Sequence, residues 1–190
     1  MFKVFKDGKL PTKGSKYSAA VDLYAREDVV VGAGETVLIP LGVCIDLDSL
    51  IGAHIYLNDG RNLPNKEDTM YEVLKANVVD LFLNSHYLQL MLRSSLGKKG
   101  LILPNGVGII DMDYKDEIMM IIHAPIHSIT RDLGTLCMCE DNIMDEPLNW
   151  SYSIKKGDRV AQIMLCEHKS YLFGIDSTEE RVGGFGSTGV

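Results

Sequence analysis

Short apolar runs separated by turn residues constrain the fold of this chain more strongly than any other feature. The run Val29–Val31 ends at Gly32-Ala33-Gly34-Glu35, and later runs are interrupted by Gly and Pro in the same way. Short strands with this punctuation are typical of antiparallel barrels and double-sheet jelly rolls. We therefore predict an all-β fold, a jelly-roll β-barrel. Strands are expected within 29–31, 36–47, 88–92, 106–110, 118–122 and 159–165.

Two segments depart from the strand pattern. Asp68 or Thr69 is a suitable N-cap, and the residues that follow repeat at helical spacing, which predicts a helix over about 69–83. The segment 127–149 is irregular and acidic, so we expect it to be exposed and to stay away from phosphate groups. The apolar residues that set the helical spacing are Met70, Tyr71, Leu74, Val78, Leu81 and Phe82.

Size and composition indicate one soluble domain, residues 1–190, with elaborations. The chain is 46% hydrophobic and 24% charged, and its net charge is −7. That charge argues against sequence-independent duplex binding, so we expect no nucleic-acid partner, although a free nucleotide is compatible with it. No apolar run approaches the ~20 residues of a membrane span, and the N-terminus lacks a signal peptide's apolar core, so we expect a cytoplasmic protein without membrane contact.

The cysteines and histidines do not form a recognisable metal motif. Cys137 and Cys139 are too close together for a usual zinc knuckle, and we expect all four cysteines to be reduced. His123 and His127 are four residues apart, but no Glu lies between them as in a metalloprotease helix. We therefore predict no direct metal site. The other two cysteines are Cys44 and Cys166.

The C-terminal residues resemble a phosphate-binding loop in an unusual place. Gly184, Gly186 and Gly189 match G-x-G-x-x-G, but a dinucleotide fingerprint needs a following helix, and a P-loop needs a Lys before Ser187-Thr188. We expect a flexible arm, about 177–190, whose amides and hydroxyls meet phosphate oxygens while an aromatic ring covers a base. The alternative is an ordinary Gly/Ser tail.

Five short blocks occur in an order that resembles the five motifs of the trimeric dUTPase family. The resemblance implies a jelly-roll homotrimer whose active sites lie between subunits and whose C-terminal arm closes over a neighbour's site. It also implies hydrolysis of dUTP to dUMP and pyrophosphate, with Mg²⁺ held by the triphosphate and waters. The blocks are Ala19–Ala25, Arg93–Gly97, Asn105–Tyr114, Gly157–Ile163, and Arg181 with the glycine-rich tail.

The resemblance assigns catalytic roles to three residues. Hydrolysis at phosphorus needs an oriented water and a base, and Asp111 follows an apolar strand and matches the family's base. Asp22 matches an acid near the metal-bound waters, and Gln162 matches a phosphate contact. Without the resemblance, Asp111 could equally be an aspartate that ends a strand at a turn. Asp22 could be a structural hydrogen-bond acceptor.

The resemblance also assigns substrate contacts. Arg93, Ser94 and Ser95 correspond to phosphate-binding residues. The amide of Asn105 presents a donor and an acceptor that suit the uracil edge, and Gly108 belongs to the same block. Tyr114 corresponds to the tyrosine beneath the deoxyribose, which excludes a 2′-hydroxyl. On the arm, Phe185 would stack on uracil, and the expected γ-phosphate contacts are Arg181, Gly186, Ser187 and Thr188.

The chain departs from the family pattern at several points. Ala20 replaces the usual Gly of the first block, Asp116 replaces a Gly after the third, and Arg181 lies four rather than five residues before Phe185. Insertions are expected at about 55–86 and 127–149. Each insertion is either decoration of the barrel or a surface for a protein partner.

Two other functions compete with that of a dUTPase. A dCTP deaminase shares the barrel and an Arg-Ser-Ser block, but it needs a glutamate where this chain has Ile121, and an apolar residue cannot serve as a general acid or base. The other alternative is a regulatory protein of the same fold, in which nucleotide controls partner binding through the insertions.

Overall fold

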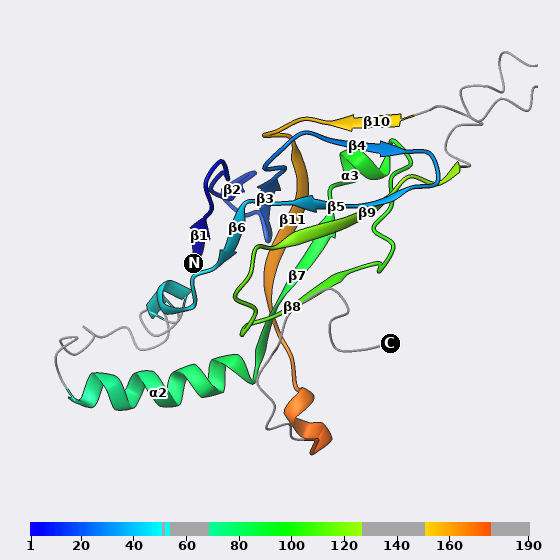
Figure 1. Ribbon diagram of the computed structural model, residues 1–190. Helices are drawn as coiled ribbons and strands as arrows, with labels where there is room; N and C mark the ends of the chain where they lie inside the picture. Colours follow the sequence, from blue (N-terminus) through cyan, green and yellow to red (C-terminus); the bar gives the residue numbers. More distant parts are fainter. Residues whose placement is uncertain (51, 54–68, 127–150, 176–190) are drawn as a thin grey trace, which may run out of the picture.

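The computed structural model describes residues 1–50, 52–53, 69–126 and 151–175, and strands dominate these ranges (Figure 1). The strands are β1 (Phe2–Val4), β2 (Thr12–Lys13), β3 (Val21–Tyr24), β4 (Val29–Gly32), β5 (Thr36–Pro40), β6 (Val43–Ile45), β7 (His86–Leu92), β8 (Gly108–Asp111), β9 (Met119–His123), β10 (Ser151–Ile154) and β11 (Arg159–Glu167). The helices are α2 (Thr69–Leu83), the short α3 (Ser94–Gly97) and the 3-10 helix η2 (Ser170–Phe173). The predicted all-β class is confirmed.

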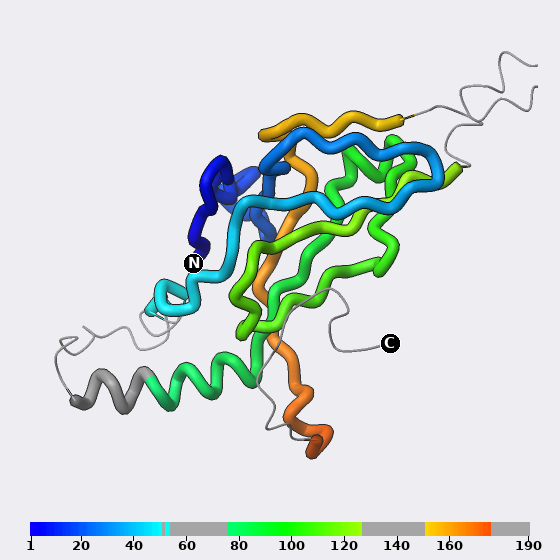
Figure 2. The backbone as a smooth tube through the Cα atoms, viewed as in Figure 1, coloured from blue at the N-terminus to red at the C-terminus, as the bar shows by residue number. Residues whose placement is uncertain are grey.

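One five-stranded antiparallel sheet forms the centre of the molecule, in the order β2-β3-β11-β7-β8. Three antiparallel pairs, β1-β6, β10-β4 and β5-β9, complete the sheets of the described residues. Figure 2 shows β4, β5, β9 and β10 crossing above the strands that run down through β7 and β11. The core lies between these layers and includes Leu23, Ile39, Met120, Ile122 and Ile163, each at most 1% exposed.

The alternation of side chains along β7 divides the central sheet into two faces. Leu88 and Leu90 are each 3% exposed and pack in the core, whereas Gln89 and Met91 point to the opposite, outer face. Residues that pair directly across strands share a face. The register therefore places the functional positions of β3, β11 and β8 on this outer face, namely Asp22, Gln162 and Asp111.

The predicted helix is confirmed with its expected bounds, Thr69–Leu83. The helix packs against the start of β7 through Phe82, which is 1% exposed. The Phe82 ring stacks on His86 at a centroid distance of 4.2 Å. The apolar stretch 36–47 forms two strands rather than one, because the chain turns at Gly42, whose φ of +68° suits glycine. The last strand extends to Glu167, where it still pairs with His86.

Several sequence predictions concern residues outside the described ranges. These are the loop before α2, the acidic segment 127–149, and the arm 177–190. Among the described cysteines, Cys44 and Cys166 are free thiols. His123 ends β9, and its Nδ1 shares a hydrogen bond of 2.9 Å with the Thr36 hydroxyl. No helix in the described part of the chain has the length and apolar character needed to cross a membrane.

Candidate active site

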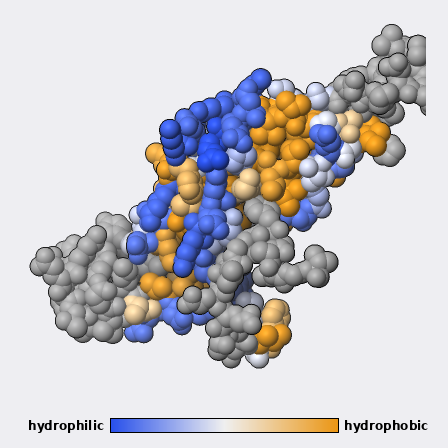
Figure 3. Space-filling view, viewed as in Figure 1, coloured by the Kyte–Doolittle hydropathy of each residue, from blue (hydrophilic) through white to orange (hydrophobic). Residues whose placement is uncertain are grey.

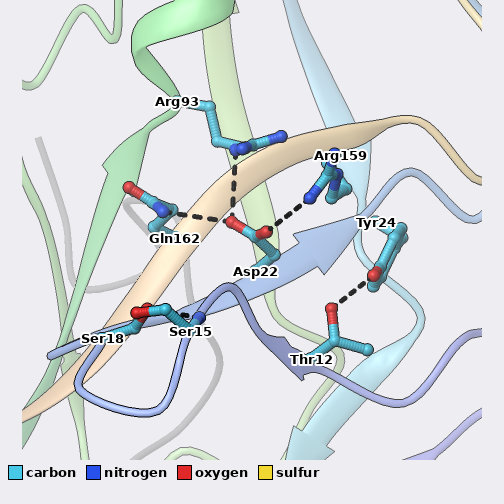
Figure 4. Close-up of polar contacts among 8 residues, drawn as sticks. All are labelled: Thr12, Ser15, Ser18, Asp22, Tyr24, Arg93, Arg159 and Gln162. Carbon is cyan, nitrogen blue, oxygen red and sulfur yellow. Dashed lines mark hydrogen bonds and ion pairs between the residues drawn. The ribbon is translucent and has the colours of Figure 1, made fainter.

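Asp22 is the centre of a polar cluster on the outer face of the sheet (Figure 4). Its side chain is 3% exposed. Its Oδ1 lies 3.2 Å from Arg93 Nε and accepts a hydrogen bond from Gln162 Nε2 at 3.1 Å. Its Oδ2 accepts a hydrogen bond from Arg159 Nη1 at 3.3 Å. Both carboxylate oxygens are therefore occupied by protein donors.

Strand register brings these four side chains together. Gln162 on β11 lies directly opposite Asp22 on β3. The register shifts between Arg159 and Ala161, a bulge of the kind that redirects a side chain. Arg93 follows β7, and its backbone N–H donates to the Val160 carbonyl at 3.1 Å, which fixes it beside β11. Residues distant in sequence thus meet because three neighbouring strands present them on one face.

The cluster carries a net positive charge. One carboxylate faces two guanidinium groups, and arginine stays protonated at all ordinary pH values. The side chains of Arg93 and Arg159 are 23% and 51% exposed, so their remaining N–H donors reach solvent. A forked guanidinium suits phosphate oxygens, which accept two parallel hydrogen bonds. The arrangement is suited to binding an anion.

Ser94 and Ser95 begin α3 immediately after Arg93, and both are exposed. The Arg93 carbonyl accepts hydrogen bonds from the N–H groups of Leu96 and Gly97, at 3.0 and 3.2 Å. Leu96 is 6% exposed and packs this turn against the core. The tight turn therefore presents two hydroxyls next to the cationic cluster.

A pocket of about 320 Å³ lies at the hairpin that ends in β8. Three of the predicted substrate residues, Asn105, Gly108 and Tyr114, line this pocket. The walls are otherwise apolar, which suits a flat base and a sugar ring held by a few polar groups. The remaining lining residues are Leu90, Leu103, Ile109, Ile110, Ile118, Met119 and Ile121.

Two glycines shape this hairpin. Gly106 adopts a φ of +70°, a conformation that side chains rarely accept. At Gly108 a Cβ atom would lie 3.0 Å from Leu90 Cβ, so β8 approaches β7 more closely there than a larger residue permits. The close approach fixes the position of the pocket wall relative to the sheet.

Tyr114 is 9% exposed and is held at both ends. Its backbone N–H donates to the Asp111 carbonyl at 3.1 Å, and its hydroxyl donates to the Glu117 carbonyl at 3.0 Å. The Glu117 carboxylate in turn accepts from the Gly42 N–H at 2.7 Å and pairs with Arg26 at 3.0 Å. These bonds orient the ring beside the pocket, although Asp116 replaces the family's glycine in the same turn.

Asp111 and the cationic cluster are far apart within one chain. Asp111 is exposed, ends β8 and lies opposite Tyr87, near the start of β7. Arg93 lies six residues further along, beyond the other end of β7, which corresponds to about 20 Å at the rise of a strand. The structure therefore joins Asp22, Arg93 and Gln162 in one cluster and holds Asp111 apart from it, while Asn105, Gly108 and Tyr114 line the pocket.

The structure adds one residue to the predicted set and leaves another group untested. Arg159 belongs to the fourth sequence block, but the sequence does not predict it as a site residue, because its proximity to Asp22 depends on the pairing of β11 with β3 beside the bulge. The one signal in the sequence is the positive charge of Arg159 in the same block as Gln162. The arm residues Arg181, Phe185, Gly186, Ser187 and Thr188 lie outside the described ranges.

Comparisons with known proteins identify the family. A scan against protein-family models finds no match. The deoxyuridine 5'-triphosphate nucleotidohydrolase of Rickettsia canadensis (strain McKiel) is 30% identical over 189 residues, covering 96% of this chain and 90% of that protein. The protein of the same name from Desulfitobacterium hafniense (strain DSM 10664 / DCB-2) is 29% identical over 192 residues, covering 97% and 90%.

A solved structure supports the fold independently of close sequence identity. The dUTPase from phage phi11 of S. aureus superposes with a TM-score of 0.54 at 16% identity, covering 98% of this chain and 97% of that chain. This likeness confirms the jelly-roll β fold. Because the Rickettsia relative matches nearly the whole chain at 30% identity, the chain belongs to the deoxyuridine 5'-triphosphate nucleotidohydrolase family, the dUTPases.

Proposed function

We propose that this protein hydrolyses dUTP to dUMP and pyrophosphate by attack of a water molecule on the α-phosphate. The observation that carries the proposal is the pairing of two features. An apolar pocket with one amide and one fixed tyrosine suits a pyrimidine deoxynucleoside, and a cationic cluster on the same sheet suits its phosphates.

The pocket selects the base and the sugar. The side-chain amide of Asn105 offers one donor and one acceptor, which complement the O4 and N3–H edge of uracil and mismatch that of cytosine. Tyr114 packs beneath the deoxyribose and leaves no space for a 2′-hydroxyl. Its two hydrogen bonds to the turn keep the ring in place, so exclusion does not depend on a mobile side chain.

The cluster binds the phosphates. Arg93 donates charge-assisted hydrogen bonds to phosphate oxygens, Ser94 and Ser95 donate from their hydroxyls, and the Gln162 amide adds a further contact. Asp22 acts mainly by fixing the cations that surround it, since both of its oxygens already accept from them. Asp111 orients the attacking water and accepts its proton.

The separation of Asp111 from Arg93 is the reason to propose a homotrimer with shared sites. A nucleoside bound near Asp111 cannot reach a phosphate cluster about 20 Å away on the same chain, so a second copy has to supply one half. Exposed apolar residues on η2 and just after it favour such an assembly (Figure 3). They are Tyr171, Leu172, Phe173 and Ile175, which are 57% to 82% exposed.

The arm 177–190 completes the site. In this proposal Phe185 covers the uracil ring, and Arg181, Gly186, Ser187 and Thr188 contact the γ-phosphate. Closure of an arm over bound substrate excludes water other than the attacking molecule and fixes its geometry. The spacing between Arg181 and Phe185 is one residue shorter than is usual in the family, so Arg181 is the arm residue that departs most from the family pattern.

Mg²⁺ is the proposed cofactor, held by the triphosphate and its waters. The described residues contain no group of three or more His, Cys, Asp or Glu side chains that could hold a metal alone. This composition fits Mg²⁺, which keeps several waters and binds through substrate phosphates with few protein ligands. When bound, the ion would neutralise charge on the phosphoryl oxygens, and Asp22 is the residue that the resemblance places near its waters.

A pyrophosphate-release assay with dUTP, dTTP, dCTP and UTP tests the proposal. We expect turnover of dUTP and rejection of the other three by factors of at least about 100, because mismatched polar edges in a closed pocket are costly. Folded, oligomeric protein that leaves dUTP intact in the presence of magnesium would contradict it. Equal turnover of dUTP and UTP would contradict the role of Tyr114 alone.

A further inference from the structure

The amino-terminal part of this acidic chain is basic. The whole chain has 19 Lys and Arg against 26 Asp and Glu. In residues 1–26 the balance is reversed, and these residues supply β2 and β3, which form one side of the cationic cluster. The basic residues are Lys3, Lys6, Lys9, Lys13, Lys16 and Arg26, and the acidic ones are Asp7 and Asp22.

Lys9 is the member of this group that the fold holds beside the cluster. Its ammonium nitrogen lies 3.9 Å from the centroid of the Tyr24 ring. Tyr24 is 6% exposed, and its hydroxyl shares a short hydrogen bond with the hydroxyl of Thr12. A cation over an aromatic face is attracted by the ring, so Tyr24 fixes the position of the lysine.

The same tyrosine belongs to the phosphate cluster. Tyr24 lies two residues after Asp22 on β3, hence on the same face, and it pairs in register with Arg159 (Figure 4). Lys9 therefore contacts the ring of a residue whose cross-strand neighbour, Arg159, belongs to the cluster. Two cations, Arg93 and Arg159, pair with the Asp22 carboxylate, and Lys9 is a further cation on the neighbouring tyrosine.

Among the described residues, some basic side chains are paired with acids, and Lys9 is one of those that are not. Within the described ranges, no carboxylate lies within ion-pair distance of the Lys9 ammonium. By contrast, Arg26 pairs with Glu117 at 3.0 Å. The lysines that pair with acids are Lys3 with Asp46, Lys155 with Asp28, and Lys156 with Asp7.

We propose that Lys9 is a third cation of the phosphate-binding site and contacts the terminal phosphates of the bound nucleotide, with Tyr24 and Thr12 as its positioning residues. An ammonium group has three donors, so contact with a ring leaves donors for phosphate oxygens. The inference rests on the proposed function. It extends the site to the segment before β2, which none of the five sequence blocks includes.

Calorimetric binding of inorganic pyrophosphate to the full-length protein tests this inference. We compare wild type with Lys9→Met, Lys9→Arg and Lys3→Met. The last is a matched control, because it removes the same charge from an exposed side chain of the same terminal segment. We expect Lys9→Met to weaken binding about fivefold at low salt and less than about twofold at 0.5 M salt, since exposed charges are screened.

The three variants distinguish direct phosphate contact from a structural role of Lys9. Retention of affinity in Lys9→Arg and Lys3→Met, with a smaller salt dependence in Lys9→Met, supports direct phosphate contact. Equal behaviour of Lys9→Met and Lys3→Met overturns the inference. So does a loss of affinity that is the same at every salt concentration and accompanied by a lower melting temperature, which indicates a structural role. Wild-type protein that hydrolyses dUTP while Lys9→Met binds normally leaves the proposed function intact.

Discussion

The phosphate cluster and the nucleoside pocket are built on opposite principles. The cluster is polar, and a buried carboxylate on a central strand holds its cations in fixed positions. The pocket is apolar, and a glycine turn and a close approach between β7 and β8 define its shape. The comparison shows how one sheet supports both kinds of recognition: charge is arranged by cross-strand register, and shape by a hairpin at the sheet edge.

The largest effect is expected at Asp111, the last residue of β8. Asp111→Asn removes the proposed base while retaining size and polarity. We expect turnover to fall by at least about 1,000-fold with little change in the affinity for a non-hydrolysable dUTP analogue, because only proton transfer is lost. Single-turnover kinetics and calorimetry measure the two quantities. Parallel losses of affinity and rate would show that Asp111 binds substrate instead.

Removal of the arm 177–190 is expected to produce the next largest effect. We expect turnover to fall by about 100-fold, because the reaction then proceeds without closure over the triphosphate. We expect the melting transition measured by circular dichroism to stay unchanged, because the core packs among strands of residues 1–167. Full activity after truncation would show that the cluster and the pocket suffice without the arm.

Asp22→Asn tests the electrostatic design of the cluster. The change leaves two guanidinium groups around a neutral amide, and we expect a loss of at least about 2 kcal/mol in the free energy of unfolding, together with weaker phosphate binding. Urea denaturation measures the stability. If Asn at position 22 left stability unchanged, the carboxylate would not be the organiser of the cluster.

Asp28→Asn is the matched control for Asp22, since it also removes an acid that is paired with a cation and accepts a second hydrogen bond, but on the surface. The Lys156 backbone N–H and the Lys155 ammonium lower the pKa of Asp28 below its ordinary 3.8. A lowered pKa in the folded state means that the stabilisation is present at neutral pH and is lost as the pH falls from 3.8 toward the lowered value. Because the group is solvent-exposed, we expect almost no change in unfolding at neutral pH.

Tyr114→Ala is expected to have the smallest effect on the rate with dUTP and a clear effect on selectivity. Loss of the ring opens space beneath the sugar, and we expect the preference for dUTP over UTP, measured as a ratio of kcat/KM values, to fall by about 10-fold or more. Tyr152→Ala, a partly buried tyrosine on β10, is the control. An unchanged preference would assign sugar selection to another residue.

Much of the fold could be predicted from sequence because its signals are local. The strands are predicted by short apolar runs, and α2 is predicted by a candidate N-cap and helical spacing. The structure confirms the bounds of α2. Site residues such as Asp22, Arg93 and Gln162 lie in blocks that resemble a family, and register then places them together.

The features that sequence could not supply depend on pairing between distant segments. Arg159 reaches Asp22 beside a bulge in β11, and Lys9 is held over the ring of Tyr24, the cross-strand neighbour of Arg159. Asp111 is distant from Arg93 because Asp111 pairs with Tyr87 near the start of β7, whereas Arg93 follows the end of that strand. None of these relations has a signature along the chain.

Subunit complementation tests most directly the central claim that two copies share each site. Arg93→Met and Asp111→Asn are each expected to be inactive, one for lack of a phosphate contact and the other for lack of the base. If equal amounts are co-assembled, about a quarter of the sites in a random ring receive intact Arg93 from one copy and intact Asp111 from its neighbour, so we predict about a quarter of wild-type activity. Mixed oligomers that remain as inactive as the separate variants would contradict the account.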